Sequence, residues 1–366
     1  MKAMLETAVG KVSAILSQRS RVTELEVVVD GRAEKAINYD TITGPIREGD
    51  QVVLNTTAVR LGLGTGGYHF VQCNISRPVV NMEAGGHIMK LRYTAQQVKV
   101  LSVEEEAAGW SEVFNSFHSL EGFPVVLFPL HSCLSPIAIS LKVIRPDIKI
   151  AYIMIDGAAL PVWFSETVHE LKGKGFIESV ITAGHAFGGD LEAVNIYSAL
   201  ITAKEIVKAD VAVVGMGPGN VGTGTKWGFS GTQLGEAINA VNILMGQPIF
   251  CPRISFADSR PRHWGISHHS LTVLTEIALS PAVVVLPFIG DEKKDLFLRK
   301  QVEENGINEK HTIVWEYGQA GLEQIKEKGL KVCSMGRGLK EDEDFFLTAC
   351  AAGIYAGKLS VQVGLN

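Results

Sequence analysis

From Phe123 to the end of the chain, short apolar runs alternate with longer amphipathic segments, and this alternation constrains the fold more than any other feature. The apolar runs have the length of buried strands and cover residues 125–129, 148–155, 177–182, 211–215, 248–253, 283–287 and 313–315. Helix-length segments lie near residues 136–143, 164–174, 191–209, 232–245, 267–279, 291–305, 322–328 and 342–356. Repeated β–α alternation predicts a doubly wound, mainly parallel sheet with helices on both faces, in a Rossmann-like α/β domain. We assign this domain to residues 123–366.

Residues 1–100 follow a different pattern, in which short strands are separated by tight turns. The predicted strands cover residues 25–29, 33–40, 52–54 and 68–75. The dipeptide Asp30-Gly31 between the first two is typical of a two-residue hairpin. Many short strands with such turns predict a small β-barrel or sandwich. Residues 101–122 are polar and mixed, so we interpret them as the connection between two domains.

Residues typical of binding and catalytic sites (His, Asp, Arg, Ser, Cys and Gly) follow the predicted strands of the second domain. These stretches are 131–133, 156–157, 182–190, 215–231, 255–270 and 290–291. In an open α/β sheet, ligands bind beyond the carboxyl ends of the strands, where loops and helix N-termini converge. The pattern therefore predicts a site at this edge of the sheet.

The richest of these loops follows the apolar run Val211–Val214 and holds seven glycines between Gly215 and Gly231. A strand, a Gly-rich loop and a helix together bring backbone N–H groups close to an anion. The residues predicted to bind the anion are Gly217, Gly219, Asn220, Gly222, Thr223, Gly224 and Thr225. The alternative is a long turn that packs tightly and binds nothing.

Part of this loop, residues 217–222, matches the dinucleotide fingerprint G-x-G-x-x-G. That fingerprint normally leads directly into a helix, and an acidic residue ends the next strand about 20 residues later. Here residues 222–226 lengthen the loop, and the next strand ends near Phe250 without an acid. The spacing of a P-loop is absent as well, because Lys226 is followed by Trp227. The loop therefore predicts anion binding more strongly than NAD binding.

Histidine and aspartate side chains in the neighbouring loops have the chemistry for proton transfer. We predict that His185 or His263 is catalytic and that Asp190 or Asp258 orients the imidazole.

A second interpretation of these loops is a divalent metal site. His268, His269 and Asp156 supply the imidazole and carboxylate ligands that such metals take. Adjacent residues on a helix point about 100° apart, so two neighbouring histidines seldom reach one metal. Metal-free acid–base chemistry and metal-assisted chemistry both stay open.

Three arginines lie within ten residues of this region. Arg253, Arg260 and Arg262 carry planar donor groups suited to a carboxylate or a phosphate, and we predict that Arg260 and Arg262 clamp the ligand. Ion pairing with nearby acids is the alternative. Cys133, just past a predicted strand, is either a nucleophile or a buried thiol.

Composition excludes several classes of partner. The net charge of −5 without a basic cluster argues against nucleic acid, and the apolar runs are too short to span a membrane. Five scattered cysteines without C-x-x-C spacing fit free thiols in the cytoplasm. Whether the chain forms a homo-oligomer stays open.

Several long sequence words carry a resemblance to a known family. They are LHS (130–132), GHAFGGDLEAVN (184–195), MGPGNVGTGTKWGFSG (216–231), SFADSRPRHWGISHHS (255–270), LNTTAVRLGLGTGG (54–67) and GGHIMKLRYT (85–94). On these words the chain resembles a bacterial family of unknown function, domain of unknown function 3866. The resemblance implies that both halves form one unit, and it implies no substrate, cofactor or catalytic residue.

The residues together predict an enzyme that binds a small phosphorylated, nucleotide or carboxylate ligand at the Gly-rich loop. Hydrolysis or group transfer would use His/Asp acid–base or metal-assisted chemistry. An NAD(P)-dependent oxidoreductase and a non-catalytic metabolite sensor are the alternatives.

Overall fold

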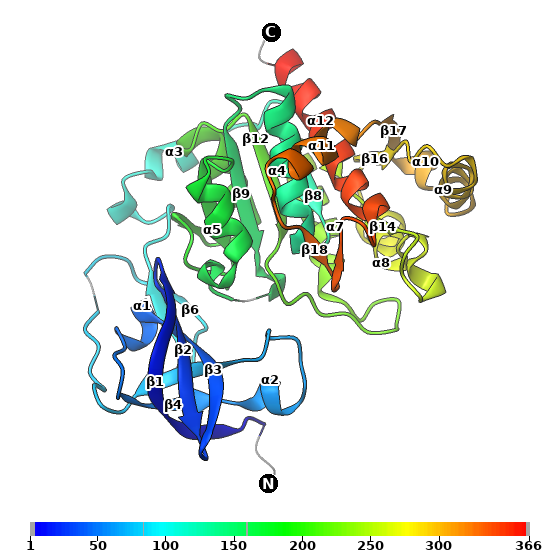
Figure 1. Ribbon diagram of the computed structural model, residues 1–366. Helices are drawn as coiled ribbons and strands as arrows, with labels where there is room; N and C mark the ends of the chain where they lie inside the picture. The colour runs from blue at the N-terminus through cyan, green and yellow to red at the C-terminus, as the bar shows by residue number, and fades with distance from the viewer. Residues whose placement is uncertain (1–3, 83, 159, 364–366) are drawn as a thin grey trace. The chain divides into compact units, whose positions relative to one another are not determined.

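The computed structural model describes residues 4–82, 84–158 and 160–363 of the chain. Contacts divide the chain into two compact units, Met1–Lys99 and Val100–Asn366, each drawn in Figure 1. Each unit has its own hydrophobic core, and each is described by itself below.

The first unit is a closed five-stranded barrel with the strand order β1-β2-β3-β5-β4. The strands are β1 (Thr7–Arg19), β2 (Val22–Val29), β3 (Arg32–Tyr39), β4 (Gln51–Asn55) and β5 (Tyr68–Asn74), with short helices α1 (Asp40–Thr43) and α2 (Thr57–Arg60). A separate two-stranded sheet joins β6 (Ile88–Lys90) and β7 (Val98–Val100). Pairing of β1 with β4 closes the barrel, and β3 runs parallel to β5, which is the Greek-key order of OB-fold barrels. Of the two predicted alternatives, the barrel is therefore confirmed.

Local sequence explains the hairpin between β2 and β3. Asp30 and Gly31 have φ angles of 49° and 76°, the left-handed conformation that a type I′ turn requires at both positions. On β2, Leu25, Val27 and Val29 point into the barrel core, while the residues between them are more exposed. This period of two is what a strand with one buried face needs.

The second unit is built on an eight-stranded sheet in the order β11-β10-β9-β12-β8-β13-β16-β17. Its strands are β8 (Pro124–Phe128), β9 (Ile150–Ile155), β10 (Ser179–Ala183), β11 (Leu191–Ala193), β12 (Val211–Met216), β13 (Gln247–Phe250), β16 (Val283–Pro287) and β17 (Thr312–Glu316). Every neighbouring pair is parallel. The predicted Rossmann-like architecture is confirmed. Two small antiparallel ribbons pair β14 (Ile254–Ser255) with β15 (Gly265–Ile266) and β18 (Cys333–Ser334) with β19 (Arg337–Gly338).

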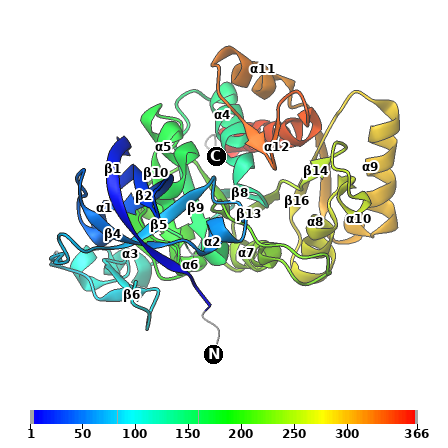
Figure 2. The same ribbon diagram turned by 60° about the horizontal axis from the view of Figure 1, so that its bottom comes forward.

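Helices cover both faces of this sheet, as Figures 1 and 2 show. One face packs against α6 (Ile196–Ile201), α7 (Gln233–Ile243), α8 (His268–Thr272), α9 (Glu292–Glu304) and α10 (Ile307–Lys310). The other packs against α4 (Leu134–Ile144), α5 (Glu166–Gly173), α11 (Gln319–Glu327) and α12 (Glu343–Val363), while the short α3 (Ser111–Asn115) precedes the sheet. Along β8, Val125 and Leu127 face one core and Val126 and Phe128 face the other, so the strand is apolar throughout.

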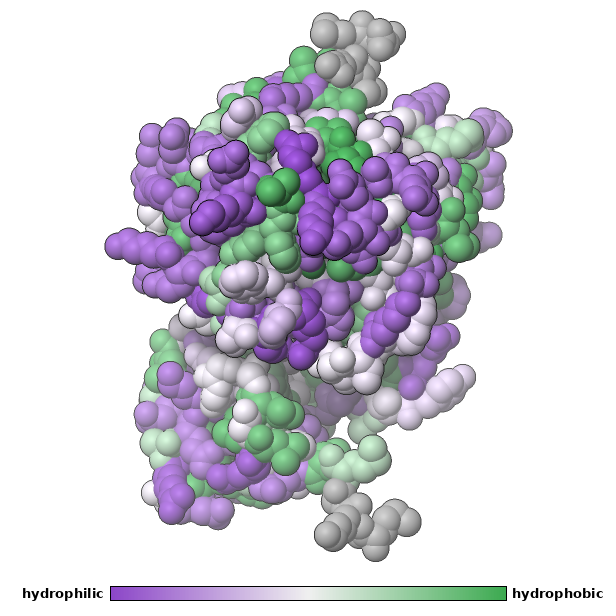
Figure 3. Space-filling view, turned by 90° about the vertical axis from the view of Figure 1, so that its right-hand side faces the viewer, coloured by the Kyte–Doolittle hydropathy of each residue, from purple (hydrophilic) through white to green (hydrophobic). Residues whose placement is uncertain are grey.

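The surface of the helical layers is mixed in character. In Figure 3, hydrophilic residues predominate on the side of the second unit where α9, rich in Lys and Glu, lies. Within the described residues, every helix is too short or too polar to cross a membrane.

One predicted element is wrong in part. The segment predicted as a single helix over 191–209 starts with the edge strand β11, which pairs with β10, and α6 begins only at Ile196. The side chain of Asn195 accepts a hydrogen bond from the Ser198 N–H and so caps this helix. The sequence pattern hides a three-residue strand because its length is below that of a periodic signal.

Candidate functional site

The direction of the chain reverses around β8, and this reversal defines the candidate site. After β8 the chain crosses to β9 on one side, whereas after β12 it crosses to β13 on the other side. Such a reversal opens a crevice at the carboxyl ends of parallel strands. A cavity of about 30 Å³ lies there; it is lined by Pro129, Leu130, Asn220, Phe229, Gly231, Leu234, Arg253, His269, Ser270 and Val273.

The Gly-rich loop reaches this crevice from the end of β12. The side-chain amide of Asn220 donates a hydrogen bond of 2.8 Å to the Pro129 carbonyl, which joins the loop to the end of β8. Beyond Asn220, residues Val221–Ser230 form what we call the glycine hairpin, visible below the sheet in Figure 1. Its arms are held by hydrogen bonds from Thr223 N to Gly228 O (2.8 Å) and from Ser230 N to Val221 O (2.9 Å).

The hairpin uses some of the donors that were predicted to cradle an anion. The N–H of Thr223 bonds across the hairpin, and the N–H of Thr225 bonds to the Thr223 hydroxyl (3.2 Å). Helix α7 begins only at Gln233, so the hairpin separates the G-x-G-x-x-G segment from the helix. The short turn directly into a helix that dinucleotide binding uses is thus not formed here.

Three positions of this loop require glycine, either for backbone conformation or for close packing. Gly219 has a φ of 91°, which is strained for any residue with a Cβ, although the space around it is open. A Cβ on Gly222 would lie 3.1 Å from Cε1 of His269, and one on Gly228 would collide with two threonine hydroxyls of the hairpin. Backbone conformation and packing therefore account for much of the glycine content.

Asp258 is the centre of an arginine network. Its carboxylate accepts hydrogen bonds from Arg253 Nη2 (2.7 Å) and from Nε and Nη2 of Arg260 (2.9 Å each), and only 3% of the residue is exposed. These guanidinium groups, that of Arg260 first, hold the pKa of Asp258 well below its usual range. Arg260, predicted to clamp a ligand, thus has its planar donors on Asp258.

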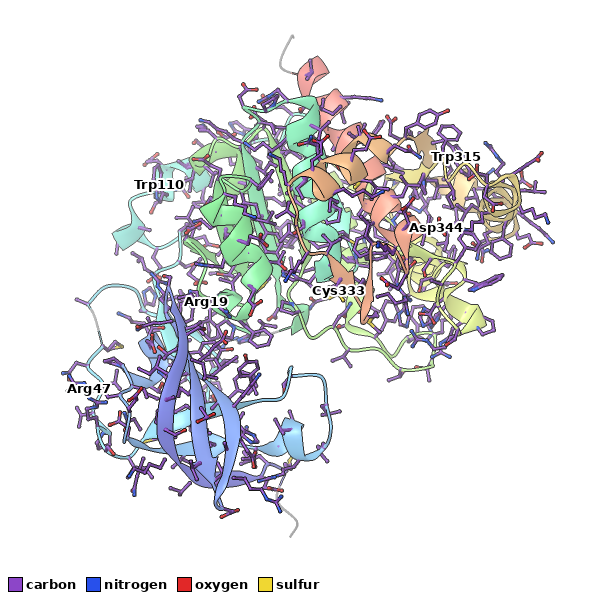
Figure 4. The ribbon with its side chains drawn as sticks, in the orientation of Figure 1. Arg19, Arg47, Trp110, Trp315, Cys333 and Asp344 are labelled. Atoms are coloured by element: carbon purple, nitrogen blue, oxygen red, sulfur yellow. The ribbon has the colours of Figure 1, made fainter. Side chains whose placement is uncertain are left out.

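A second carboxylate joins this network from far along the chain. Arg337, on β19, places Nη2 3.6 Å from Asp258 and donates from Nε to Asp342 at 3.0 Å. The hydroxyl of Ser255 also donates to Asp342. Figure 4 labels Cys333 on the same β18–β19 ribbon. Arg337 and Asp342 were not predicted, since they follow the other site residues by more than 60 positions and no local motif marks them.

Three histidines pack together beside the arginines. The ring centroids of His268 and His269 are 4.0 Å apart, and that of His263 lies 4.9 Å from the former and 5.5 Å from the latter. Nδ1 of His263 contacts Arg253 Nη1 (2.7 Å) and the Ser267 hydroxyl (2.8 Å). The partners of Nδ1 are therefore Arg253 and Ser267. The predicted pairing of His263 with Asp258 is not formed.

Burial and the neighbouring guanidinium groups favour the neutral form of all three imidazoles. Burial and the charges of Arg253 and Arg260 lower the pKa of His263 to about 3. Burial, with smaller effects from the other histidine and the arginines, lowers the pKa of His269 to about 4, and burial also lowers the pKa of His268.

Two ring nitrogens of this group lack a partner. Nε2 of His268 and Nε2 of His269 are buried and make no hydrogen bond. A backbone interaction with Thr223 raises the pKa of His269 and so opposes the effect of burial. With the imidazole proton on Nδ1, Nε2 carries a lone pair that no donor of the described residues meets. Most buried polar atoms in proteins are paired, so these two nitrogens need an explanation.

We call this set the arginine–histidine cluster; it comprises Arg253, Arg260, Arg262, Arg337, His263, His268, His269, Asp258 and Asp342. Four guanidinium groups and two carboxylates leave two positive charges in excess. Arg262 is exposed, and no acidic side chain of the described residues pairs with it. Its charge is nevertheless close enough to contribute to the lowered pKa of His268. The cluster is therefore suited to an anion.

Other predicted residues lie outside this cluster. Asp156, at the end of β9, accepts a hydrogen bond of 2.6 Å from the backbone N–H of His185. Asp190 pairs with Lys172 and accepts from the Val180 N–H at 2.8 Å. The contacts made by the Asp190 carboxylate are thus those of a structural ion pair at the edge of the sheet.

The structure also bears on the predicted metal ligands and nucleophile. Across residues 4–82, 84–158 and 160–363, no three His, Cys, Asp or Glu side chains are grouped so that they could hold a metal ion. Cys133 is 1% exposed and packs with the thiol of Cys251, whose pKa is raised by that neighbour and by burial. A buried thiol with this neighbour is a packing residue rather than an accessible nucleophile.

A comparison with families of known proteins identifies a match. The profile of a family described as "Protein of unknown function (DUF3866)" matches residues 35–353, which include the whole eight-stranded sheet, the glycine hairpin and the arginine–histidine cluster. No curated protein matches the chain.

Proposed function

We propose that this chain, which belongs to the DUF3866 family of proteins of unknown function, binds a small phosphorylated or carboxylated molecule at the arginine–histidine cluster and transfers a proton or a group there. One observation carries the proposal: two buried imidazole nitrogens, on His268 and His269, lack partners beside a surplus of guanidinium groups. A buried polar atom without a partner costs free energy, and a ligand or water that bonds to it removes this cost.

The contacts favour particular roles for the residues. Arg262 is the exposed guanidinium and meets the charge of the incoming anion, whereas Arg253 and Arg260 are held by Asp258 and maintain the positive field. His269, neutral and with a free lone pair on Nε2, is the proton acceptor. This assignment replaces the pair His263–Asp258 as the acid–base group, because Arg253 and Ser267 occupy Nδ1 of His263.

Binding is tested by isothermal titration at constant ionic strength with orthophosphate, a nucleoside monophosphate and a small carboxylate. We expect His269→Gln and Arg262→Gln each to weaken binding by about tenfold or more, since each removes a charged or hydrogen-bonded contact of about 1.4 kcal/mol or more. The matched control is Arg92→Gln, which removes an exposed guanidinium from the other unit and should leave binding unchanged. Equal affinities in all four proteins, or no binding by the wild type, contradict the proposal.

Turnover separates an enzyme from a sensor. Release of phosphate or alcohol from phosphate monoesters that depends on His269 supports hydrolysis or transfer. Binding without any product over the same range supports the sensor alternative.

A further inference from the structure

The glycine hairpin covers His269. The Phe229 ring stacks on the imidazole with centroids 4.1 Å apart and planes 12° from parallel. The backbone of Gly222 passes so close that an added Cβ would lie 3.1 Å from Cε1 of His269. Both arms of the hairpin thus lie against the residue that the proposed function uses as its proton acceptor.

The cavity under this cover is too small for an anion. Its volume of about 30 Å³ is enough for about one water molecule. Orthophosphate has five heavy atoms, so it needs more space than one water occupies. Phe229 and Gly231 form part of the wall, and a ligand can therefore reach Nε2 of His269 only if this wall moves.

The tip of the hairpin is weakly attached to the rest of the unit, whereas Phe229 near its base is 8% exposed and packs in the hydrophobic core. Residues 221–227 are exposed, and the backbone bonds between its arms are internal, so they persist when it moves as one piece. At the tip, Lys226 makes an ion pair of 2.6 Å with Glu276, and the two side chains are 53% and 38% exposed. Exposed pairs of this kind contribute little to stability.

A glycine marks the base of the hairpin on the side of β12. Gly219, with a φ of 91° and open space around it, precedes the Asn220 anchor to Pro129. A lid needs a few residues at its base that absorb backbone rotation, and this position has that freedom.

We propose that the glycine hairpin is a lid over the arginine–histidine cluster, closed in this structure, that opens about its base to admit a small anion. The identity of the ligand rests on the proposed function; the motion of the lid does not. Opening separates Phe229 from His269, breaks the Lys226–Glu276 pair and, because the rotation occurs at Gly219, releases Asn220 from the Pro129 carbonyl.

Chemical access to His269 tests the lid without any ligand. In a Cys73→Ser/Cys333→Ser background, which removes the exposed thiols, the changes Lys226→Cys and Glu276→Cys allow a short bis-maleimide to cross-link the tip. Diethyl pyrocarbonate then modifies accessible neutral imidazoles, and peptide mass spectrometry measures the rate at each histidine. His118, which is exposed, serves as the internal reference.

We expect the cross-link to slow modification of His269 by about tenfold or more, as for a site reached only through local opening, and to leave His118 unchanged. A variant that needs no cross-link, Glu276→Gln, should speed modification of His269, whereas the matched surface change Glu323→Gln should not. Equal rates with and without the cross-link, or no effect of Glu276→Gln, overturn the lid.

Addition of orthophosphate to the uncross-linked protein distinguishes the two proposals. If phosphate slows the modification of His269, the result supports both the lid and the proposed ligand. If the cross-link slows modification but phosphate does not, the lid stands and the proposed ligand fails. If phosphate protects His269 while the cross-link has no effect, the lid fails and the proposed function stands.

Discussion

Replacement of Asp258 by Asn removes the charge that holds the arginine network together. Asp258 is 3% exposed and accepts three side-chain hydrogen bonds, and Arg253, its closest partner at 2.7 Å, is only 6% exposed. Removing one member of a buried ion pair leaves the other uncompensated, at a cost of about 3–5 kcal/mol. Asn keeps one acceptor oxygen, and Arg260 is partly exposed, so we expect a loss near the lower end, about 3 kcal/mol.

The effect depends on pH in a direction that the structure determines. The folded pKa of Asp258 is lowered, so its contribution to stability is complete above the unfolded pKa of about 3.9 and declines as the pH falls toward the folded value. The difference between wild type and Asp258→Asn should therefore be constant from pH 7 to about 5 and should shrink below about pH 4.

Urea unfolding followed by tryptophan fluorescence measures this difference, because all five tryptophans lie in residues 100–366. The control is Asp190→Asn, whose carboxylate is 42% exposed in its pair with Lys172 and should cost less than about 1 kcal/mol. A loss below about 1 kcal/mol for Asp258→Asn, or an equal loss at pH 7 and pH 3, refutes the reasoning.

Three further predictions concern single features. Gly219→Ala should destabilise the protein by about 1 kcal/mol because of the positive φ, whereas Gly224→Ala, in equally open space without a positive φ, should be nearly neutral in thermal unfolding. In the native protein, a thiol reagent should label only Cys73 and Cys333, and complete labelling of all five cysteines before unfolding would contradict the burial of the other three. The Cε1 proton of His269 should titrate near pH 4 in NMR spectra, so that its contribution to stability is complete above about pH 6.5 and is lost as the pH falls toward 4; titration near 6.5 would show that the ring is solvated.

Much of the fold was accessible from local patterns. Fully apolar runs such as Val211–Val214 predict strands buried on both faces, and Asp30-Gly31 predicts the β2–β3 hairpin, because short-range chemistry decides both. The edge strand Leu191–Ala193 was missed, since three residues carry no period. The long strand β1 was also missed: its pairing with β2 shifts register twice, which breaks the alternation of buried and exposed residues.

The loops that would meet were predicted, but their pairings were not. The rule that ligands bind at the carboxyl ends of strands predicted a site among the loops that follow β12 and β13, and the structure brings residues of both loops together around one cavity. Spacing alone could not tell that Asp258 would bond Arg253 and Arg260 instead of His263, because all four lie within eleven residues. Arg337 comes from a ribbon that only the tertiary fold brings to Asp258.

The most direct test of the central claim is an NMR titration of the histidine side-chain nitrogens with orthophosphate at constant ionic strength. An anion bound in the arginine–histidine cluster stabilises the imidazolium form. We therefore predict that the Nε2 resonances of His268 and His269 shift to saturation and that the pKa of His269 rises from about 4. Unchanged Nε2 resonances and an unchanged pKa of His269 at saturating phosphate would contradict the account.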